Sequence, residues 1–268
     1  MIAVEITKLL RRPRTWVTIL MLNALPTLVA VLLAVTDIGP RPGEGPVFLS
    51  AVLSNGTLFP LAALAVILPL FLPVAVAVIA GDSIAGEAQA GTLRYLLVRP
   101  VGRTRLLVAK LASIFVFVLL AVIAVAGIAY VVGTNLFGTA SVAASVSGTT
   151  LTNSQIAVRT ALAIGYITLS MLGVAAMALF LSTLTDSPLA ATLGALAFLI
   201  ASSLLFTLDA ADALSPYLPT RYWLAFTDLF RDPIQWRDIT RGIALQGVYV
   251  GVLLSAAWAN FTTKDIKS

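Results

Sequence analysis

The sequence predicts an all-α polytopic membrane protein with six transmembrane helices. Of its 268 residues, 59% are hydrophobic and only 11% are charged, whereas a soluble domain has about 25% charged residues. The hydrophobic residues form six runs of at least about 20 residues, the length that an α-helix needs to cross a bilayer. The bases gather beside these runs, above all near the N-terminus and between the second and third runs.

The composition excludes several classes of function. The chain has no cysteine and no histidine, so it has no disulfide, no thiolate or imidazole metal site and no histidine acid–base chemistry. The net charge is +5, but the bases flank apolar runs. We therefore expect the lipid bilayer as the partner of these bases, and no nucleic acid.

The N-terminus predicts an amphipathic interfacial helix over residues 2–12, lying on an anionic leaflet. Its apolar stripe has helical spacing and consists of Ile2, Ile6, Leu9 and Leu10. Its polar face consists of Glu5, Lys8, Arg11 and Arg12. Pro13 ends the helix. Two interpretations remain open, a fixed basic anchor and a contact surface for a cytosolic partner.

We expect a single transmembrane domain over residues 1–268. The spans are predicted at about residues 16–35, 57–80, 106–132, 156–184, 189–208 and 239–261. No cleavage site follows the first run, so it is expected to be retained. Pro69 and Pro73 lie one turn apart in the second span, and each removes a backbone hydrogen bond. That helix should bend or contain a weakened segment.

The connections differ in character. Residues 133–155 carry no charge and are rich in small polar residues, which predicts a loosely structured outer segment. Residues 209–238 are rich in aromatic residues, which are typical of the membrane–water interface. Arg159, near the outer end of the fourth span, is expected to reach the lipid headgroups. Thr185–Pro188 predicts a tight inner turn with Pro188 at the first helical position.

The distribution of bases predicts the orientation. With both termini inside, the inner side holds eleven of the seventeen bases. These are Lys8, Arg11, Arg12, Arg14, Arg94, Arg99, Arg103, Arg105, Lys110, Lys264 and Lys267. Because bases remain preferentially on the cytoplasmic side, we expect both termini in the cytoplasm. The high content of Ala, Val and Leu, with Arg preferred over Lys, suggests a GC-rich bacterial genome. We therefore expect a multi-pass protein of the bacterial plasma membrane.

The stretch 81–110 is too polar to lie within the lipid bilayer, and its sequence is too regular for a flexible linker. Leu93, Leu96 and Leu97 fall at i, i+3 and i+4, which predicts one or two helical turns with an apolar face. Thr92 can cap the start of this helix. Pro100 ends it, because proline disfavours helical geometry in the residue before it.

The chain shows the architecture of a transporter without a visible source of energy. It contains no G-x-x-x-x-G-K-[ST] phosphate-binding loop and no catalytic cluster, so it is not expected to be an enzyme. The middle of the six spans has almost no ionisable residue. Ion-coupled carriers keep such residues there, so a carrier driven by ion binding is disfavoured.

The stretch 81–110 resembles the permeases of the ABC type-2 exporter family. The similar pattern is Gly81-Asp82-Ser83-Ile84-Ala85-Gly86-Glu87, then Gly91-Thr92-Leu93-Arg94, Leu97, Arg99-Pro100-Val101, Arg103 and Lys110-Leu111. The six-helix plan and the amphipathic N-terminal helix also agree in layout. The chain differs from larger family members in lacking a large outer domain and a fused ATPase.

The resemblance implies a cytoplasmic coupling helix, Thr92–Arg99, between the second and third spans. It would lie in a groove of a separate ATP-binding subunit, and the N-terminal helix would be a second contact. The coupling contact would comprise Glu87, Gly91, Thr92, Leu93, Arg94, Leu96, Leu97, Arg99, Pro100 and Arg103. The second contact would comprise Glu5, Lys8, Arg11 and Arg12. Glu87 would pair with a base of its own loop or of the ATPase.

By the same resemblance, two permease subunits, expected to be identical, would assemble with two ATP-binding subunits. ATP and magnesium would be bound by those subunits, and this chain would carry no cofactor. The complex would export a hydrophobic or amphipathic compound such as a drug, lipid or peptide. Residues 209–238 would form an external lid. The alternative function is a membrane anchor or assembly subunit of another complex, without its own transport path.

Overall fold

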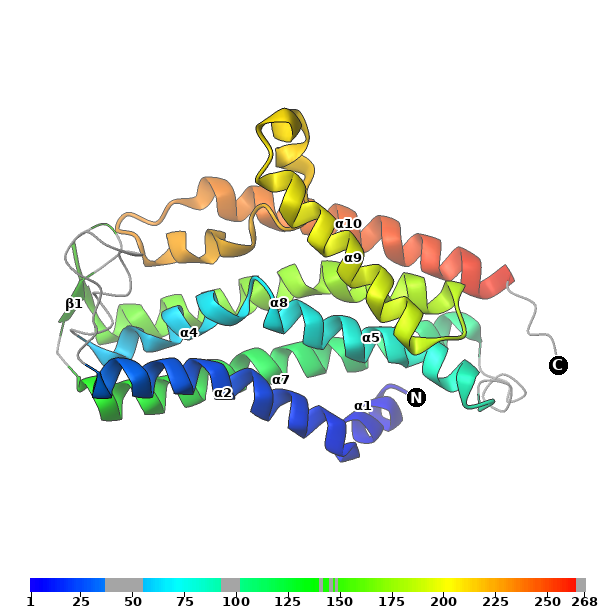
Figure 1. Ribbon diagram of the computed structural model, residues 1–268, viewed down its shortest axis with the longest axis horizontal. Helices are drawn as coiled ribbons and strands as arrows, with labels where there is room; N and C mark the ends of the chain where they lie inside the picture. Colours follow the sequence, from blue (N-terminus) through cyan, green and yellow to red (C-terminus); the bar gives the residue numbers. More distant parts are fainter. Residues whose placement is uncertain (37–54, 93–101, 140–141, 145–146, 148, 264–268) are drawn as a thin grey trace.

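A computed structural model describes residues 1–36, 55–92, 102–139, 142–144, 147 and 149–263. These residues form an elongated helical bundle (Figure 1). Six of its helices are long and apolar enough to cross a membrane. They are α2 (Pro13–Val35), α5 (Phe71–Gln89), α7 (Arg103–Phe137), α8 (Asn153–Leu184), α9 (Pro188–Phe206) and α10 (Trp236–Thr263). The prediction of a six-span helical membrane protein is thereby confirmed.

Several helices continue past the predicted spans. The 35 residues of α7 give it a length of about 52 Å at 1.5 Å per residue, against about 30 Å for the hydrocarbon layer. At the start of α7 the added residues include Arg103 and Arg105. Polar side chains can leave the lipid while the backbone keeps its helical hydrogen bonds, so a hydropathy pattern understates the helix length.

The second predicted span is broken into two helices. A 3₁₀ turn, η1 (Gly56–Leu58), leads into α4 (Phe59–Ile67), and α5 follows it along the same axis (Figure 1). The break falls at Pro69, which lacks the N–H that would continue the ladder. The weakened segment is confirmed, but the helix runs on to Gln89 rather than ending near residue 80. Asp82 and Glu87 therefore lie on a helix.

Helix α8 is the most deeply buried of the six, and it packs against α5, α7, α9 and α10. One of its hydroxyls enters the backbone of α5. Ser182 Oγ donates to Gly81 O (2.7 Å) and accepts from Ala85 N–H (2.8 Å) and Ile84 N–H (3.2 Å). These three hydrogen bonds tie the C-terminal half of α5 to α8.

The inner turns follow the sequence closely. Helix α1 (Ile2–Arg11) ends before Pro13, which begins α2, as predicted. Ser187 caps α9 by accepting from Ala190 N–H, and Pro188 is the first helical residue. α1 and the C-terminal end of α10 lie toward the same end of the long axis (Figure 1), as an even number of spans requires.

The outer end is more ordered than expected. Strands β1 (Val142–Ala144) and β2 (Thr150–Thr152) form an antiparallel pair in which Ala143 lies opposite Leu151. This pair replaces part of the predicted loose segment, and Thr152 then caps α8 through a capping box with Gln155.

The segment 209–238 forms two 3₁₀ helices, η2 (Asp209–Tyr217) and η3 (Trp223–Phe230). The interface assignment is wrong for part of it, because η3 packs against α8 and α10 with Trp223, Phe226 and Phe230 buried. Tyr217 and Trp236 are exposed, in agreement with the assignment. Aromatic density alone does not separate rings that face headgroups from rings that fill a core.

The prediction that Arg159 reaches the lipid headgroups is wrong. Its side chain is buried, and it donates to Arg231 O at 2.9 Å and to Asp232 Oδ1 at 3.5 Å. The turn between η3 and α10 supplies acceptors inside the protein, so the guanidinium ties that turn to α8.

Candidate functional site

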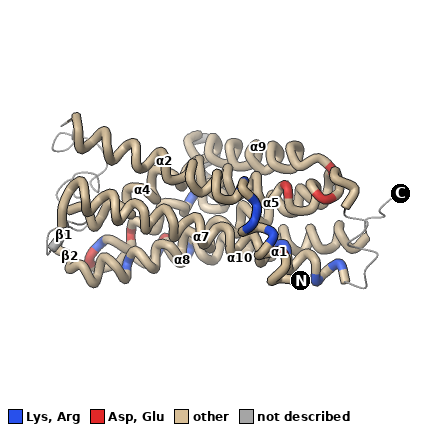
Figure 2. Tube along the Cα trace, turned by 90° about the horizontal axis from the view of Figure 1, so that it is seen from below, with Lys and Arg blue, Asp and Glu red and all other residues tan. Residues whose placement is uncertain are grey.

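Three helices bring charged side chains together where α1 crosses the bundle. In the tube view, α1 lies beside α5 and α7, and Lys, Arg, Asp and Glu positions cluster at this crossing (Figure 2). By contrast, α4 and α9 contain no charged residue. We call Glu5, Lys8, Glu87 and Lys110 the ion network.

The ion network centres on Lys110. Its Nζ lies 2.5 Å from Glu87 Oε1 and 2.8 Å from Glu5 Oε2. Lys8 Nζ lies 2.6 Å from the same Glu87 oxygen. The side chains of Lys110, Glu87 and Glu5 are 4%, 6% and 9% exposed, and only Lys8 reaches solvent, at 40%. The network therefore joins α1, α5 and α7 through contacts that water barely screens.

The charges of the ion network balance, with two carboxylates and two ammonium groups. A balanced buried network contributes little net stability, because desolvation opposes the ion pairing, but losing one member leaves an uncompensated charge. Its main effect is geometric, since it fixes where α1 sits on α5 and α7. Glu87 Oε2 is buried and has no hydrogen-bond partner among the residues described.

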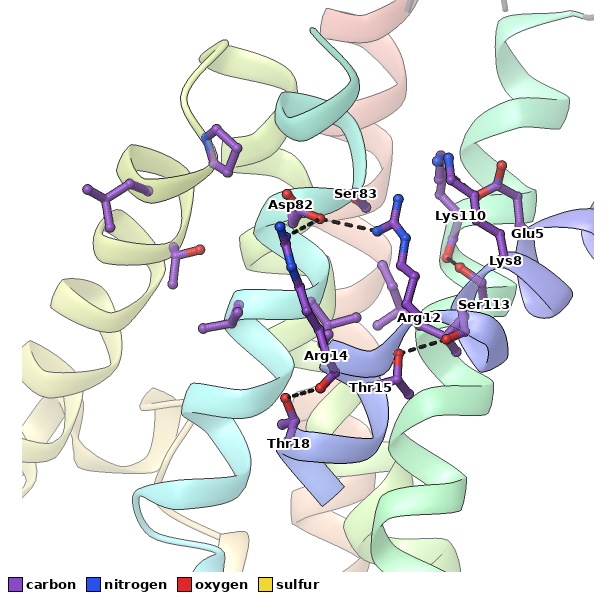
Figure 3. A pocket seen from close by; sticks show the side chains of 17 residues that line it. Glu5, Lys8, Arg12, Arg14, Thr15, Thr18, Asp82, Ser83, Lys110 and Ser113 are labelled. Atoms are coloured by element: carbon purple, nitrogen blue, oxygen red, sulfur yellow. Dashed lines mark hydrogen bonds and ion pairs between the residues drawn. The ribbon is translucent and has the colours of Figure 1, made fainter. Parts of the chain in front are cut away.

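Next to the network, two guanidiniums share one carboxylate. Arg12 lies 3.2 Å and Arg14 lies 3.9 Å from Asp82 Oδ2. We call Arg12, Arg14 and Asp82 the guanidinium cluster. Figure 3 shows both arginines extending from the junction of α1 and α2 to Asp82 of α5. All three residues line a cavity of about 290 Å³.

Glu87 also takes part in ending α5. Gly91 has a φ of +67°, a left-handed conformation that glycine adopts without strain. Gly91 N–H donates to Ala88 O and Thr92 N–H to Glu87 O, each at 3.0 Å, which is the hydrogen-bond pattern of a Schellman motif. Thr92 Oγ1 donates to Glu87 O as well. Thr92, predicted to start the next helix, thus closes the end of α5.

The start of α7 is tied to the end of α10. Arg103 Nη1 donates to Phe261 O and Thr262 O, both at 3.0 Å, where a helix leaves carbonyls without partners. Trp258 Nε1 donates to Thr104 Oγ1. Arg103, predicted as part of the coupling contact, therefore also anchors α7 within the chain.

The predicted site residues have three outcomes. Glu5, Lys8 and Glu87 come together, but Glu5 is buried rather than on the outer polar face of its helix, because Lys110 draws it inward. Arg11 is exposed and Arg12 lines the cavity. Leu93, Arg94, Leu96, Leu97, Arg99 and Pro100 lie outside the described residues.

Sequence reasoning did not assign Lys110, Asp82 or Arg14 to the site. The position of Lys110 inside the predicted third span indicates that it belongs to a site, because a charge within a span needs a partner. In the described part of the chain no group of three or more His, Cys, Asp or Glu side chains could hold a metal ion. The charged side chains that the structure brings together connect α1, α5 and α7.

The six long apolar helices define a polytopic helical membrane protein, and its charged side chains gather where α1 crosses α5 and α7. The chain belongs to the DUF2705 family, described as a protein of unknown function, and the family model matches residues 46–266. A search of curated proteins found no match.

Proposed function

We propose that this chain is the membrane-spanning permease subunit of an ATP-binding-cassette exporter. It moves a hydrophobic or amphipathic compound outward, driven by a separate ATPase subunit. The observation that carries the proposal is the connection of the 93–101 segment to the ion network. That segment leaves α5 at Gly91 and Thr92, only a few residues from Glu87, and enters α7 just before Lys110.

This connectivity supports a coupling role. A force on the segment 93–101 acts on the ends of α5 and α7, and the Glu87–Lys110 contact joins those ends. Lys8 and Glu5 extend the same connection to α1. The two contact surfaces suggested by the family resemblance would therefore move as one unit. Helix α8, joined to α5 through Ser182, would carry the movement into the bundle.

The proposal includes an assembly and an orientation. Two copies of the chain pair with two ATP-binding subunits, which hold ATP and magnesium. The distribution of bases favours both termini in the cytoplasm of a bacterial cell, and the segment from η2 to η3 then faces outward as a lid. The path through the bundle is expected to be apolar, since α4 and α9 contain no charged residue and the charged residues of α7, α8 and α10 lie within the first eight residues of each helix.

Affinity purification of the tagged chain from its native membrane, followed by mass spectrometry, tests the proposal. We expect a soluble ATP-binding subunit at about one copy per permease. Purification of the chain alone, or with partners that lack an ATP site, would support the membrane-anchor alternative instead.

A variant pair sharpens this test. Leu93→Asp places a charge on the apolar face of the proposed coupling helix, so it should abolish substrate-stimulated ATP hydrolysis while the chain still inserts. Leu136→Asp, on the exposed surface at the far end of α7, is the matched control and should retain ATP hydrolysis. Full ATPase activity in Leu93→Asp would count against coupling through this segment.

A further inference from the structure

The cavity beside the guanidinium cluster has a charged part and an apolar part. It lies between α1, α2, α5, α7 and α9, with a volume of about 290 Å³. Its charged part is lined by the guanidinium cluster and by three members of the ion network, Glu5, Lys8 and Lys110 (Figure 3). Its apolar part includes Val78 of α5 and Leu189 of α9.

The charged part carries an excess of positive charge. Glu5 and Glu87 balance Lys8 and Lys110 within the ion network. In the described part of the chain, Arg12 and Arg14 then have only Asp82 between them, and the Arg14 contact is long, at 3.9 Å. One guanidinium charge beside the cavity is thus left without a counterion, and the Arg14 side chain is 81% exposed, so it is open to a ligand from outside. Guanidinium groups bind phosphate oxygens through paired hydrogen bonds.

The hydroxyl groups that line the cavity already donate their protons to backbone carbonyls. Thr15 Oγ1 donates to Leu9 O and Thr18 Oγ1 to Arg14 O. Ser83 and Ser113 donate to backbone carbonyls of their own helices in the same way. These hydroxyl protons are already engaged, and Lys8 and Lys110, which also line the cavity, are paired with Glu5 and Glu87. An anion in the cavity would therefore depend mainly on the two arginines.

The apolar part opens toward lipid. Val78 is 44% exposed and Leu189 is 67% exposed, and both belong to helices long and apolar enough to span the membrane. Exposed apolar surface on such helices faces acyl chains. A cavity near 300 Å³ is at the small end of ligand sites, so it holds a headgroup rather than a whole lipid. Its ligand must therefore be anionic at one end and hydrocarbon at the other.

We propose that this cavity binds the headgroup of an acidic phospholipid, with its phosphate between Arg12 and Arg14 and an acyl chain leaving past Val78 and Leu189. The proposal is independent of any ATPase partner, so it stands or falls separately from the exporter function. The bound phosphate would supply the counterion that the guanidinium cluster lacks and would fix the junction of α1 and α2 to α5 and α9.

Native mass spectrometry of the detergent-purified chain tests the proposal, with phosphatidylglycerol and phosphatidylcholine as the lipids. We expect one phosphatidylglycerol per chain, retained at least tenfold better than phosphatidylcholine. The Arg12→Gln/Arg14→Gln double variant should lose this preference. The control Arg11→Gln/Arg105→Gln removes the same charge from two exposed positions that do not line the cavity, and it should keep the preference.

A second set of measurements separates a lipid from a free anion. Inorganic phosphate and glycerol phosphate, each added alone, should raise the unfolding temperature far less than phosphatidylglycerol does. Val78→Trp fills the apolar opening and leaves both arginines in place, so it should weaken lipid binding without altering the response to phosphate. Equal effects of phosphate and lipid, or equal losses in the two double variants, would overturn the proposal.

Discussion

Lys110 of α7 and Glu87 of α5 meet in a buried ion pair of 2.5 Å between Nζ and Oε1. The two residues stand on either side of the 93–101 segment, and each has one further ionic partner in α1. The pair therefore joins the end of α5 to the start of α7, and through Lys8 and Glu5 it also joins both helices to α1. This relationship makes the ends of α5 and α7 a single mechanical unit, with the following measurable consequences.

Lys110→Met should be strongly destabilising. It leaves Glu5 and Glu87 buried and Glu5 without its cation, and loss of one member of a buried ion pair costs about 3–5 kcal/mol. Arg105→Met, at an exposed position of the same helix, should change stability by less than about 0.5 kcal/mol. Chemical unfolding followed by tryptophan fluorescence measures both variants.

A neutralised network distinguishes charge from packing in this experiment. Adding Glu5→Gln and Glu87→Gln to Lys110→Met removes the uncompensated carboxylates, so the triple variant should recover much of the lost stability. If the triple variant is less stable than Lys110→Met, packing rather than charge explains the loss.

Gly133→Ala and Gly127→Ala should have opposite effects, although both lie in α7. A Cβ at position 133 would overlap Gly56 O and Phe59 Cβ, whereas one at position 127 would meet no atom within 4 Å. Forced overpacking costs about 1–3 kcal/mol, while an exposed Gly→Ala change inside a helix gains up to about 1 kcal/mol. Unfolding temperatures of the two variants test this, and a shift in the same direction would contradict the close approach of α4 to α7.

Ser182→Ala should loosen the junction of α5 and α8. The change removes the partner of the Ala85 N–H and of Gly81 O, both buried, and an unsatisfied buried group costs about 1–3 kcal/mol. Hydrogen exchange at the Ala85 amide should accelerate. Ser255→Ala, which removes an exposed hydroxyl bonded within α10, serves as control and should leave exchange in α5 unchanged.

Gly91→Ala should destabilise the end of α5 by about 1–2 kcal/mol, the cost of a left-handed conformation for a residue with a Cβ. Gly91→Asn should cost less, since asparagine tolerates this region better. Gly102→Ala, at a position with a φ of −57°, should be close to neutral. Exchange of the Thr92 amide reports the loss directly, and unchanged protection in Gly91→Ala would argue against the Schellman motif.

Accessibility labelling tests the proposed orientation. The chain has no native cysteine, so a single introduced cysteine is the only reactive thiol. Leu214→Cys is well placed because Leu214 is 55% exposed, whereas the neighbouring Ser215 is only 7% exposed. Leu214→Cys should react with an impermeant reagent added outside the cell, and Arg105→Cys only after permeabilisation. The reverse pattern would invert the topology.

The contacts of the candidate site cannot be predicted from neighbouring residues in the sequence. The sequence marks Glu87 and Lys8 as charged residues beside apolar runs, but they lie 79 positions apart. Their meeting depends on how α1 crosses the bundle. Glu5 illustrates the same limit, since helical periodicity puts it on the polar face of α1, and the depth of Lys110 in the neighbouring helix makes that face an internal one.

By itself the sequence determined the number of long apolar helices, the break at Pro69, the start of α9 at Pro188 and the end of α1 before Pro13. These features depend on hydropathy, on missing N–H groups and on caps, all of which act within a few neighbouring residues. Only the tertiary structure decided that Lys110 joins Glu5 to Glu87, that Arg159 faces inward and that Phe226 fills the core. Those outcomes depend on which helix faces meet, and that choice depends on the packing of the entire bundle.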